Sequence, residues 1–164
     1  MLIPFKDKEP RVSPEAFIAE GAKLIGAVRV GDYASIWYNA VLRGDRGEIV
    51  VGEYSSVQDC CVFHGPVRVA DHVTVGHSAV MHGATVEENC VIGMKAVVLD
   101  GVVVGHGSII AAGAVVPQGM EIPPRSMVMG VPAKVTKELP HENEGMLREI
   151  AEAYFEFARP HMMK

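Results

Sequence analysis

Three histidines near the middle of the chain have the side-chain chemistry and the spacing of a metal site. His64 and His82 lie 18 residues apart, and His77 lies between them. Two nitrogens bound at ~2.0–2.1 Å to one tetrahedral zinc ion are roughly 3.3 Å from each other. Three neutral imidazoles leave an open position for a water, whose pKa falls to about 7 on the metal. These residue types therefore predict a hydration or hydrolysis catalyst.

Apolar residues recur every six positions, and this repeat predicts the elements that hold the histidines. Three short strands in an 18-residue coil are typical of a parallel β-helix, and β-branched side chains favour a pleated, buried surface. His64 and His82 then stack on adjacent coils, about 4.8 Å apart. The repeat has three phases: Leu24, Val30, Ile36 and Leu42; Val51, Val57, Phe63, Val69, Val75 and Met81; Val86, Ile92, Val98, Val104, Ile110 and Val116.

Two interruptions of the repeat flank the histidines. The first adds three residues around Arg43–Gly47, and the second removes one residue just after His82. Glycine also follows an inward aliphatic residue five times, which predicts corners where the backbone turns tightly or takes a positive φ. The five pairs are Val30-Gly31, Val51-Gly52, Val75-Gly76, Ile92-Gly93 and Val104-Gly105.

The length and composition predict one domain, residues 1–164, with a β-helix over about 12–130. Apolar residues make up 49% of the chain but aromatic residues only 6%, which fits a narrow aliphatic core. From about 143 to 159 the spacing becomes helical and predicts a helix alongside the coil, ended by Pro160. Its apolar face would consist of Met146, Ile150, Tyr154 and Phe157. Five prolines between Pro117 and Pro140 predict an extended strap before this helix.

Composition also argues against several classes of protein. Apolar stretches fall far short of the ~20 residues of a membrane span, and the start, Met1–Lys8, lacks a signal-peptide pattern. We therefore expect a cytoplasmic protein with no membrane partner. A net charge of −5 argues against nucleic acid as a partner. Cys60, Cys61 and Cys90 match no disulfide framework, and we expect buried thiols.

His77 does not share the 18-residue spacing of the other two histidines. It lies 13 residues after His64 and five before His82, on another edge of the triangular coil. It is therefore not expected to reach the same ion within one chain. A three-fold oligomer removes the difficulty, because the edge of one coil can face the flank of its neighbour. The metal would then lie between chains.

Polar residues surround the histidines at both sides of the first interruption. Arg43 and Asp45 lie within it, and Gln58 and Asp59 come about six residues before His64. Arginine and carboxylate form paired hydrogen bonds. We therefore expect Arg43 to pair with Asp45 or Asp59 and to hold the subunit interface together. Gln58 is placed to hydrogen-bond a metal-bound water. The alternative is that all four residues only hold subunits together.

Several motifs resemble the γ-class carbonic anhydrases and their close relatives over nearly the whole chain. The histidine pattern is specific, whereas Gly-Val-Pro-Ala-Lys also occurs in hexapeptide-repeat acyltransferases. The motifs are Leu-Arg-Gly-Asp at 42–45, Val-Gln-Asp-Cys-Cys-Val-Phe-His at 57–64, Gly-His-Ser-Ala-Val-Met-His-Gly at 76–83, Ile-Gly-Met at 92–94 and Gly-Val-Pro-Ala-Lys at 130–134.

The resemblance implies a left-handed β-helix, an exception to the right-handed rule for β-crossovers, in a homotrimer with three interface sites. It implies zinc, or alternatively ferrous iron or cobalt, as cofactor, with His64, His77 and His82 as ligands. Gln58 would orient the hydroxide, and Tyr154 matches an active-site tyrosine or only packs the helix. Arg43, Asp45 and Asp59 would form the interface network.

One departure from the family concerns proton transfer. The archetype carries an acidic loop with a glutamate shuttle, but only 12 residues separate His64 from His77 and none is Glu. Glu156 stands where the family has an asparagine. Two alternatives remain: its side chain contacts the site, or it faces solvent. CO2 hydration is the first interpretation. The alternatives are a metal-dependent hydrolase such as a thioesterase, a non-catalytic trimeric scaffold and, more weakly, a hexapeptide acyltransferase.

Overall fold

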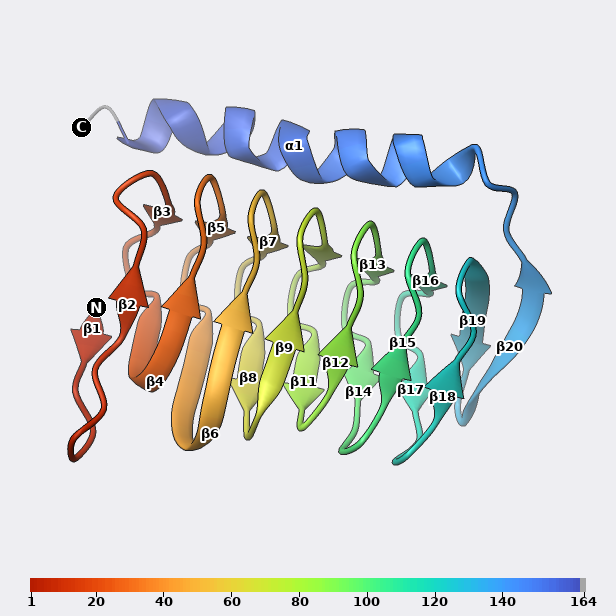
Figure 1. The fold of residues 1–164 in the computed structure, drawn as a ribbon, viewed down its shortest axis with the longest axis horizontal. Coiled ribbons are helices and arrows are strands. Elements are labelled where there is room, and N and C mark those ends of the chain that lie inside the picture. Colours follow the sequence, from red (N-terminus) through yellow and green to blue (C-terminus); the bar gives the residue numbers. More distant parts are fainter. Residues whose placement is uncertain (163–164) are drawn as a thin grey trace.

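The computed structural model describes residues 1–162, which form a long coil of short parallel strands and one C-terminal helix (Figure 1). In Figure 1 the chain rises on the near side, crosses to the far side at the top, descends there and advances towards the right. That combination of rotation and advance makes the coil left-handed. The mainly β fold predicted from the six-residue repeat is confirmed.

One side of the coil, which we call the helix face, lies beneath the C-terminal helix. Its strands pair in parallel with strands one coil away, except for the last, which runs antiparallel to its neighbour. In order they are β3 (Phe17–Ile18), β5 (Ser35–Ile36), β7 (Ser56–Val57), β10 (Thr74–Val75), β13 (Val91–Ile92), β16 (Ile109–Ile110), β19 (Ser126–Gly130) and β20 (Ala133–Glu138).

The other two sides belong to one continuous sheet, because β4 (Lys23–Val30) and β6 (Val41–Val51) bend around the corner between them. The N-terminal strands β1 (Leu2–Ile3) and β2 (Arg11–Val12) pair with β4. The histidine face contains β8 (Val62–His64), β11 (Val80–His82), β14 (Val97–Val98) and β17 (Val115–Val116). The third face contains β9 (Val67–Val69), β12 (Thr85–Val86), β15 (Val103–Val104) and β18 (Glu121–Ile122).

The apolar residues of the repeat form the core of the coil. Every member of the three predicted phases is buried, and Leu42, Phe63, Met81 and Val98 stack in register along the histidine face. Because most strands have only two or three residues, one inward aliphatic group on each side of a coil is enough to fill the axis. Burial of these groups, at ~25 cal/mol per Å² of apolar surface, is the main force that stabilises the coil.

The two interruptions correspond to changes of register between neighbouring strands. Leu42 pairs with Phe63, three residues beyond the 18-residue repeat, whereas Val62 pairs with Val80 at the normal spacing. Met81 pairs with Val98, one residue short of the repeat. The inward column continues through both changes, so the extra residues project from a corner without disturbing the core.

The predicted reason for the repeated glycines is only partly right. None of the five takes a positive φ; that conformation occurs at other corner residues such as Tyr54, Cys60 and Ser78. A Cβ on Gly93 would lie 2.5 Å from the backbone nitrogen of Ala112, and one on Gly76 would lie 2.8 Å from that of Met94. These glycines are needed because the backbones of successive coils approach closely.

The C-terminal helix α1 (Asn143–Met162) lies antiparallel to the coil axis and returns towards the N-terminal coils (Figure 1). Two details of its prediction were wrong. Pro160 lies inside the last turn, where lost backbone hydrogen bonds matter least, and the buried face is offset by one position. Met146, Ile150 and Phe157 are exposed, whereas the buried residues are Leu147, Ala151, Phe155 and Ala158. The two alanines allow the helix to approach the coil closely.

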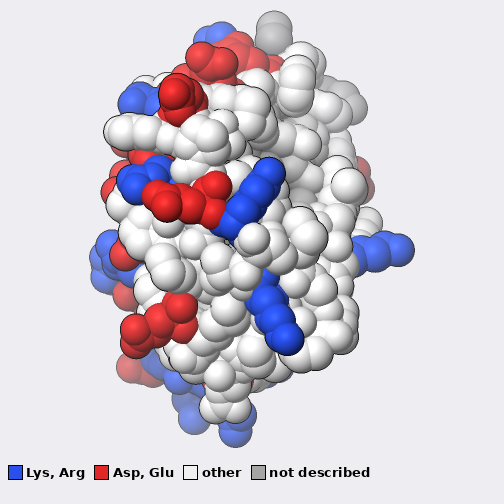
Figure 2. Space-filling model, turned by 90° about the vertical axis from the view of Figure 1, so that its right-hand side faces the viewer, with Lys and Arg blue, Asp and Glu red and all other residues white. Residues whose placement is uncertain are grey.

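The expected extended strap between Pro117 and Pro140 was also wrong. This segment contains β18, β19 and β20, and the β-helix runs from Leu2 to Glu138 beyond both expected limits. The five prolines fall between strands, where the missing N–H breaks no ladder bond. β20 closes the coil as an edge strand that carries Lys134 and Lys137, a charge pattern that opposes edge pairing. Figure 2 shows this end as a largely uncharged surface crossed by two basic side chains, the upper of which lies beside acidic groups. No helix within residues 1–162 is long and apolar enough to cross a membrane.

Candidate metal centre

His64 and His82 converge at the ends of two neighbouring strands. They are register partners on β8 and β11, and His64 Nδ1 lies 3.1 Å from His82 Nε2. This separation is close to the ~3.3 Å between two nitrogens on one tetrahedral zinc ion. The stacking that the 18-residue spacing predicts is therefore present in the structure.

A carboxylate holds the other nitrogen of each ring. Asp45 Oδ1 lies 3.1 Å from His64 Nε2, and Asp100 Oδ2 lies 2.8 Å from His82 Nδ1. An imidazole that donates one N–H to a carboxylate presents a lone pair on its other nitrogen. Two such lone pairs facing each other repel unless a proton or a cation lies between them. The donor set therefore fits a divalent ion.

The three extra residues of the first interruption bring Asp45 to His64. Arg43 is the register partner of His64 on β6, and its Nη1 lies 2.6 Å from Asp45 Oδ2. Partial burial raises the pKa of Asp45, but the hydrogen bond and charge of Arg43, with a hydrogen bond from His64, outweigh it and lower the pKa below its usual value. Asp45 is thus held as an anion between the arginine and the imidazole.

His77 lies at a different corner. It follows β10 where the helix face meets the histidine face, whereas His82 ends β11 on the far side of that face. The intervening residues span on the order of 10–15 Å when extended. Within residues 1–162 of one chain, no three His, Cys, Asp or Glu side chains converge to hold a metal ion. As expected, one chain alone does not bring the three histidines together.

His77 has its own polar partners. Its Nδ1 lies 2.8 Å from Asp59 Oδ2, and its backbone N–H donates a 3.2 Å hydrogen bond to Gln58 Oε1. Asp59 therefore pairs with His77, and Arg43 pairs with Asp45. Each of the three histidines now has one nitrogen held by a different aspartate.

A cavity of about 370 Å³ opens beside His77 between the helix face and α1. Its lining is mainly aliphatic, with Ile92, Ile109 and Ile150 among the residues, and both Gln58 and Tyr154 reach it. Tyr154 also packs edge-on against Trp37, which is the packing role considered for this tyrosine; its role in a reaction stays a prediction. Thr74 lines the cavity too, is only 4% exposed, and its Oγ1 has no hydrogen-bond partner.

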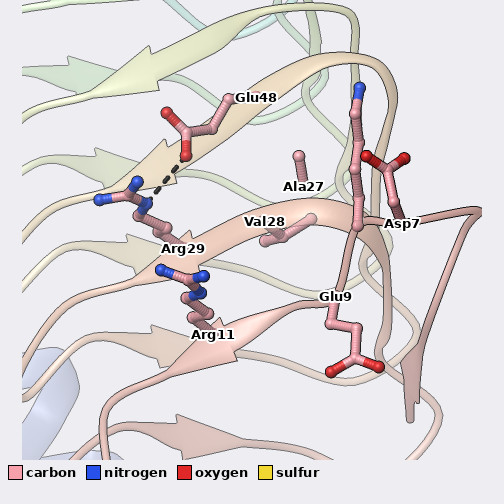
Figure 3. A pocket seen from close by; sticks show the side chains of 8 residues that line it. Asp7, Glu9, Arg11, Ala27, Val28, Arg29 and Glu48 are labelled. Atoms are coloured by element: carbon pink, nitrogen blue, oxygen red, sulfur yellow. Dashed lines mark ion pairs between the residues drawn. The ribbon is translucent and has the colours of Figure 1, made fainter.

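A smaller cavity of about 190 Å³ near the N-terminal coils contains none of the predicted site residues (Figure 3). Its acidic and basic groups balance, and Arg29 pairs with Glu48 at 2.8 Å.

The remaining histidines have structural partners: Glu152 for His72, Glu87 for His106, Glu144 for His141 and Tyr38 for His161. Glu156 pairs with Arg159 and its side chain is 61% exposed, so it faces solvent.

Sequence reasoning missed two features of this region. Asp100 lies 18 residues after His82, the same spacing that connects His64 with His82, and that spacing was the available signal. Cys60 is exposed, contrary to the expectation of three buried thiols, because the corner after β7 turns its side chain outward; Cys61 and Cys90 are buried.

Comparison with known proteins agrees with this fold. Two family models match: "Bacterial transferase hexapeptide (six repeats)" over residues 83–118 and "Hexapeptide repeat of succinyl-transferase" over residues 66–98. A crystal structure of a hexapeptide transferase family protein from Anaplasma phagocytophilum superposes with a TM-score of 0.94 at 38% identity, covering 98% of this chain and 97% of that one.

Two curated relatives carry names that specify the family. "Probable carbonic anhydrase" of Methanocaldococcus jannaschii is 46% identical over 87% of this chain and 92% of its own length. "Gamma carbonic anhydrase 1, mitochondrial" of Arabidopsis thaliana is 41% identical over 94% of this chain, which spans 60% of the plant protein. With the paired histidines in place, these identities show that the chain belongs to the γ-class carbonic anhydrase family.

Proposed function

We propose that this protein catalyses the reversible hydration of CO2 to bicarbonate at sites shared between the subunits of a homotrimer. His64 and His82 of one subunit and His77 of the next would hold a divalent ion, zinc first, with ferrous iron or cobalt as alternatives. The observation that carries the proposal is the pattern of histidines and aspartates. Two imidazoles converge with carboxylates behind them, and a third with its own carboxylate faces outward. The names of the relatives supply the substrate.

The chain's own residues would orient the reacting groups. The bound ion would supply hydroxide at neutral pH. Asp45, Asp59 and Asp100 accept the N–H groups that face away from the ion and so select the tautomer of each ring. Gln58 Oε1 accepts a hydrogen bond from the backbone N–H of His77. The NH2 group of the Gln58 amide is therefore left to donate a hydrogen bond in the cavity. A donor at this place would align the attacking oxygen with CO2.

Shared ligation has a direct test by mixing two inactive variants. In any mixed trimer of His77→Ala and His64→Ala chains, one of the three interfaces combines an intact His77 with an intact His64 and His82. An equal mixture should recover roughly a quarter of wild-type activity, since about three quarters of the trimers are mixed. Light scattering and mass spectrometry of the mixture would verify trimers and subunit exchange.

Metal content gives the matching control. Elemental analysis of protein purified without chelator should give about one divalent ion per chain, and His64→Ala should lose it, whereas exposed His141→Ala should not. Verified mixed trimers without any recovery of activity would refute shared ligation. A cytoplasmic location stays a prediction.

A second candidate function is hydrolysis of small acyl thioesters by the same centre. The cavity beside Gln58 and His77 is far larger than CO2 requires, is mainly aliphatic, and contains the unpartnered Thr74 hydroxyl. A buried hydroxyl without a partner is costly and would be satisfied by a substrate carbonyl. Stopped-flow CO2 hydration and acyl-CoA hydrolysis should be measured on the same metal-loaded trimer.

Filling the cavity separates the two activities. Ala111 lines the cavity away from the histidines, so Ala111→Phe should abolish acyl hydrolysis and leave CO2 hydration unchanged. Acyl hydrolysis that survives this change would place the acyl group elsewhere. If neither reaction occurs in metal-loaded trimer, the protein serves as a non-catalytic scaffold.

A further inference from the structure

Asp100 is the one carboxylate at the paired histidines that the family motifs did not indicate. It follows β14, one coil beyond His82, and its Oδ2 accepts a 2.8 Å hydrogen bond from His82 Nδ1. The second interruption of the repeat shifts the register at this contact by one residue. Because Met81 pairs with Val98, His82 lies opposite Leu99, and Asp100 is displaced one position along the chain, over Gly83.

Gly83 leaves the space that the Asp100 carboxylate occupies. Gly83 has φ +61°, and a Cβ there would collide with Asp100 Oδ1 and lie 3.3 Å from its Cα. The backbone N–H of Gly101 donates a 2.8 Å hydrogen bond to the carbonyl of Gly83 and ties the two corners together. The position of the carboxylate is therefore determined by backbone on both sides.

The two aspartates behind the paired rings differ in their other partners. Asp45 shares its charge with Arg43 at 2.6 Å, whereas no lysine or arginine among residues 1–162 forms an ion pair with Asp100. A carboxylate that accepts the imidazole N–H polarises it, which makes the opposite nitrogen a better electron-pair donor. His82 Nε2, the atom that faces His64, is that nitrogen.

We propose that Asp100 is a positioning residue that keeps the proton of His82 on Nδ1 and thereby makes Nε2 a strong metal donor. This inference rests on the proposed function, because it assigns His82 as a ligand. Asp100 itself touches neither the ion nor the substrate. Its effect would pass entirely through the tautomer, orientation and basicity of one imidazole.

Metal affinity is the first test. Zinc dissociation constants, measured by competition with a chelator, should rise about 10- to 100-fold in Asp100→Asn and Asp100→Ala. Asp100→Glu should recover part of the affinity. Asp32→Asn is the matched control, because the Asp32 carboxylate bonds Ser13, far from the histidines, and this variant should bind as wild type. The visible spectrum of the cobalt-loaded protein should change in Asp100→Asn and not in Asp32→Asn.

The second test needs no metal. Nitrogen-15 NMR of the metal-free protein should show His82 as the Nδ1–H tautomer in wild type and as a mixture in Asp100→Ala. Gly83→Ala, which displaces the carboxylate without removing it, should reproduce the mixture, with circular dichroism confirming the fold. If the wild-type protein binds no metal, the proposed function is refuted. The NMR measurement of the His82 tautomer would still test the role of Asp100. Unchanged tautomer and unchanged affinity in Asp100→Ala would overturn the inference.

Discussion

Single residues determine which nitrogen of each imidazole is available for chemistry. His64, His77 and His82 each engage one aspartate, and the carboxylates come from three different places: the first interruption, the corner after β7 and the corner after β14. The aspartates would thus preset the proposed site before any ion binds, which would reduce the reorganisation that binding requires. A single contact also orients Gln58, because its Oε1 accepts a hydrogen bond from the backbone N–H of His77.

Gln58→Ala should lower kcat/KM for CO2 hydration on the order of 10- to 100-fold, the equivalent of one hydrogen bond to a charged group. Gln58→Glu keeps the acceptor for the His77 N–H but removes the donor, and should be impaired as well. Exposed Gln118→Ala is the control. Stopped-flow measurement with a fixed metal content decides the matter: full kcat/KM in both variants would remove Gln58 from the attack step.

Cysteine reactivity tests the local packing. Burial raises the pKa of both Cys61 and Cys90 to about 12, so neither thiol should form the reactive thiolate at pH 8. Native protein should therefore react with a thiol reagent at no more than one cysteine per chain, Cys60, and Cys60→Ser should not react at all. Denaturant should expose every remaining thiol. Fast labelling of native Cys60→Ser would contradict the packing described for Cys61 and Cys90.

At the scale of the secondary-structure elements, the corners and the helix determine features of the site that the six-residue repeat does not predict. Corner glycines such as Gly93 permit backbones of successive coils to approach. The first interruption brings Asp45 to His64, and the second offsets Asp100 by one position relative to His82, while the inward column continues. Helix α1 covers the helix face through Leu147, Ala151 and Phe155 and closes one wall of the cavity beside His77 with Ile150 and Tyr154.

Gly93→Ala should destabilise the protein by about 1–3 kcal/mol, because the new methyl group meets the backbone of the next coil, which has no room to move. Gly145→Ala is the opposite case. Gly145 lies in α1, and a Cβ added to it would have no neighbour within 4 Å, so alanine there should stabilise the helix by up to about 1 kcal/mol. Denaturant titration of both variants measures the difference; equal stabilities would contradict the close approach of the coils.

For the whole molecule, the main expectation concerns the proton that CO2 hydration releases. The segment from His64 to His77 contains no glutamate, and Glu156 pairs with Arg159 in solvent. We therefore expect neither to supply an internal shuttle beside the proposed centre. Proton export would then depend on small molecules from solution.

The rate of CO2 hydration should therefore rise with the concentration of a small buffer such as imidazole until the attack step becomes limiting. Glu156→Gln should leave this dependence unchanged, because its carboxylate is directed to Arg159. Stopped-flow rates at several buffer concentrations and constant ionic strength provide the measurement. A high rate that ignores buffer in wild type but falls in Glu156→Gln would identify Glu156 as the shuttle after all.

The amino-acid sequence alone determined the coil, its inward column and the stacking of His64 on His82, because a fixed period of six and a fixed coil of 18 place residues by counting. It also indicated that His77 belongs to another edge. Only the tertiary structure decided which aspartate serves each imidazole, which face of α1 is buried and how the segment from Pro117 to Pro140 pairs. Those contacts depend on register changes, corner conformations and close approach between coils, and a periodic pattern carries no information about the places where the period breaks.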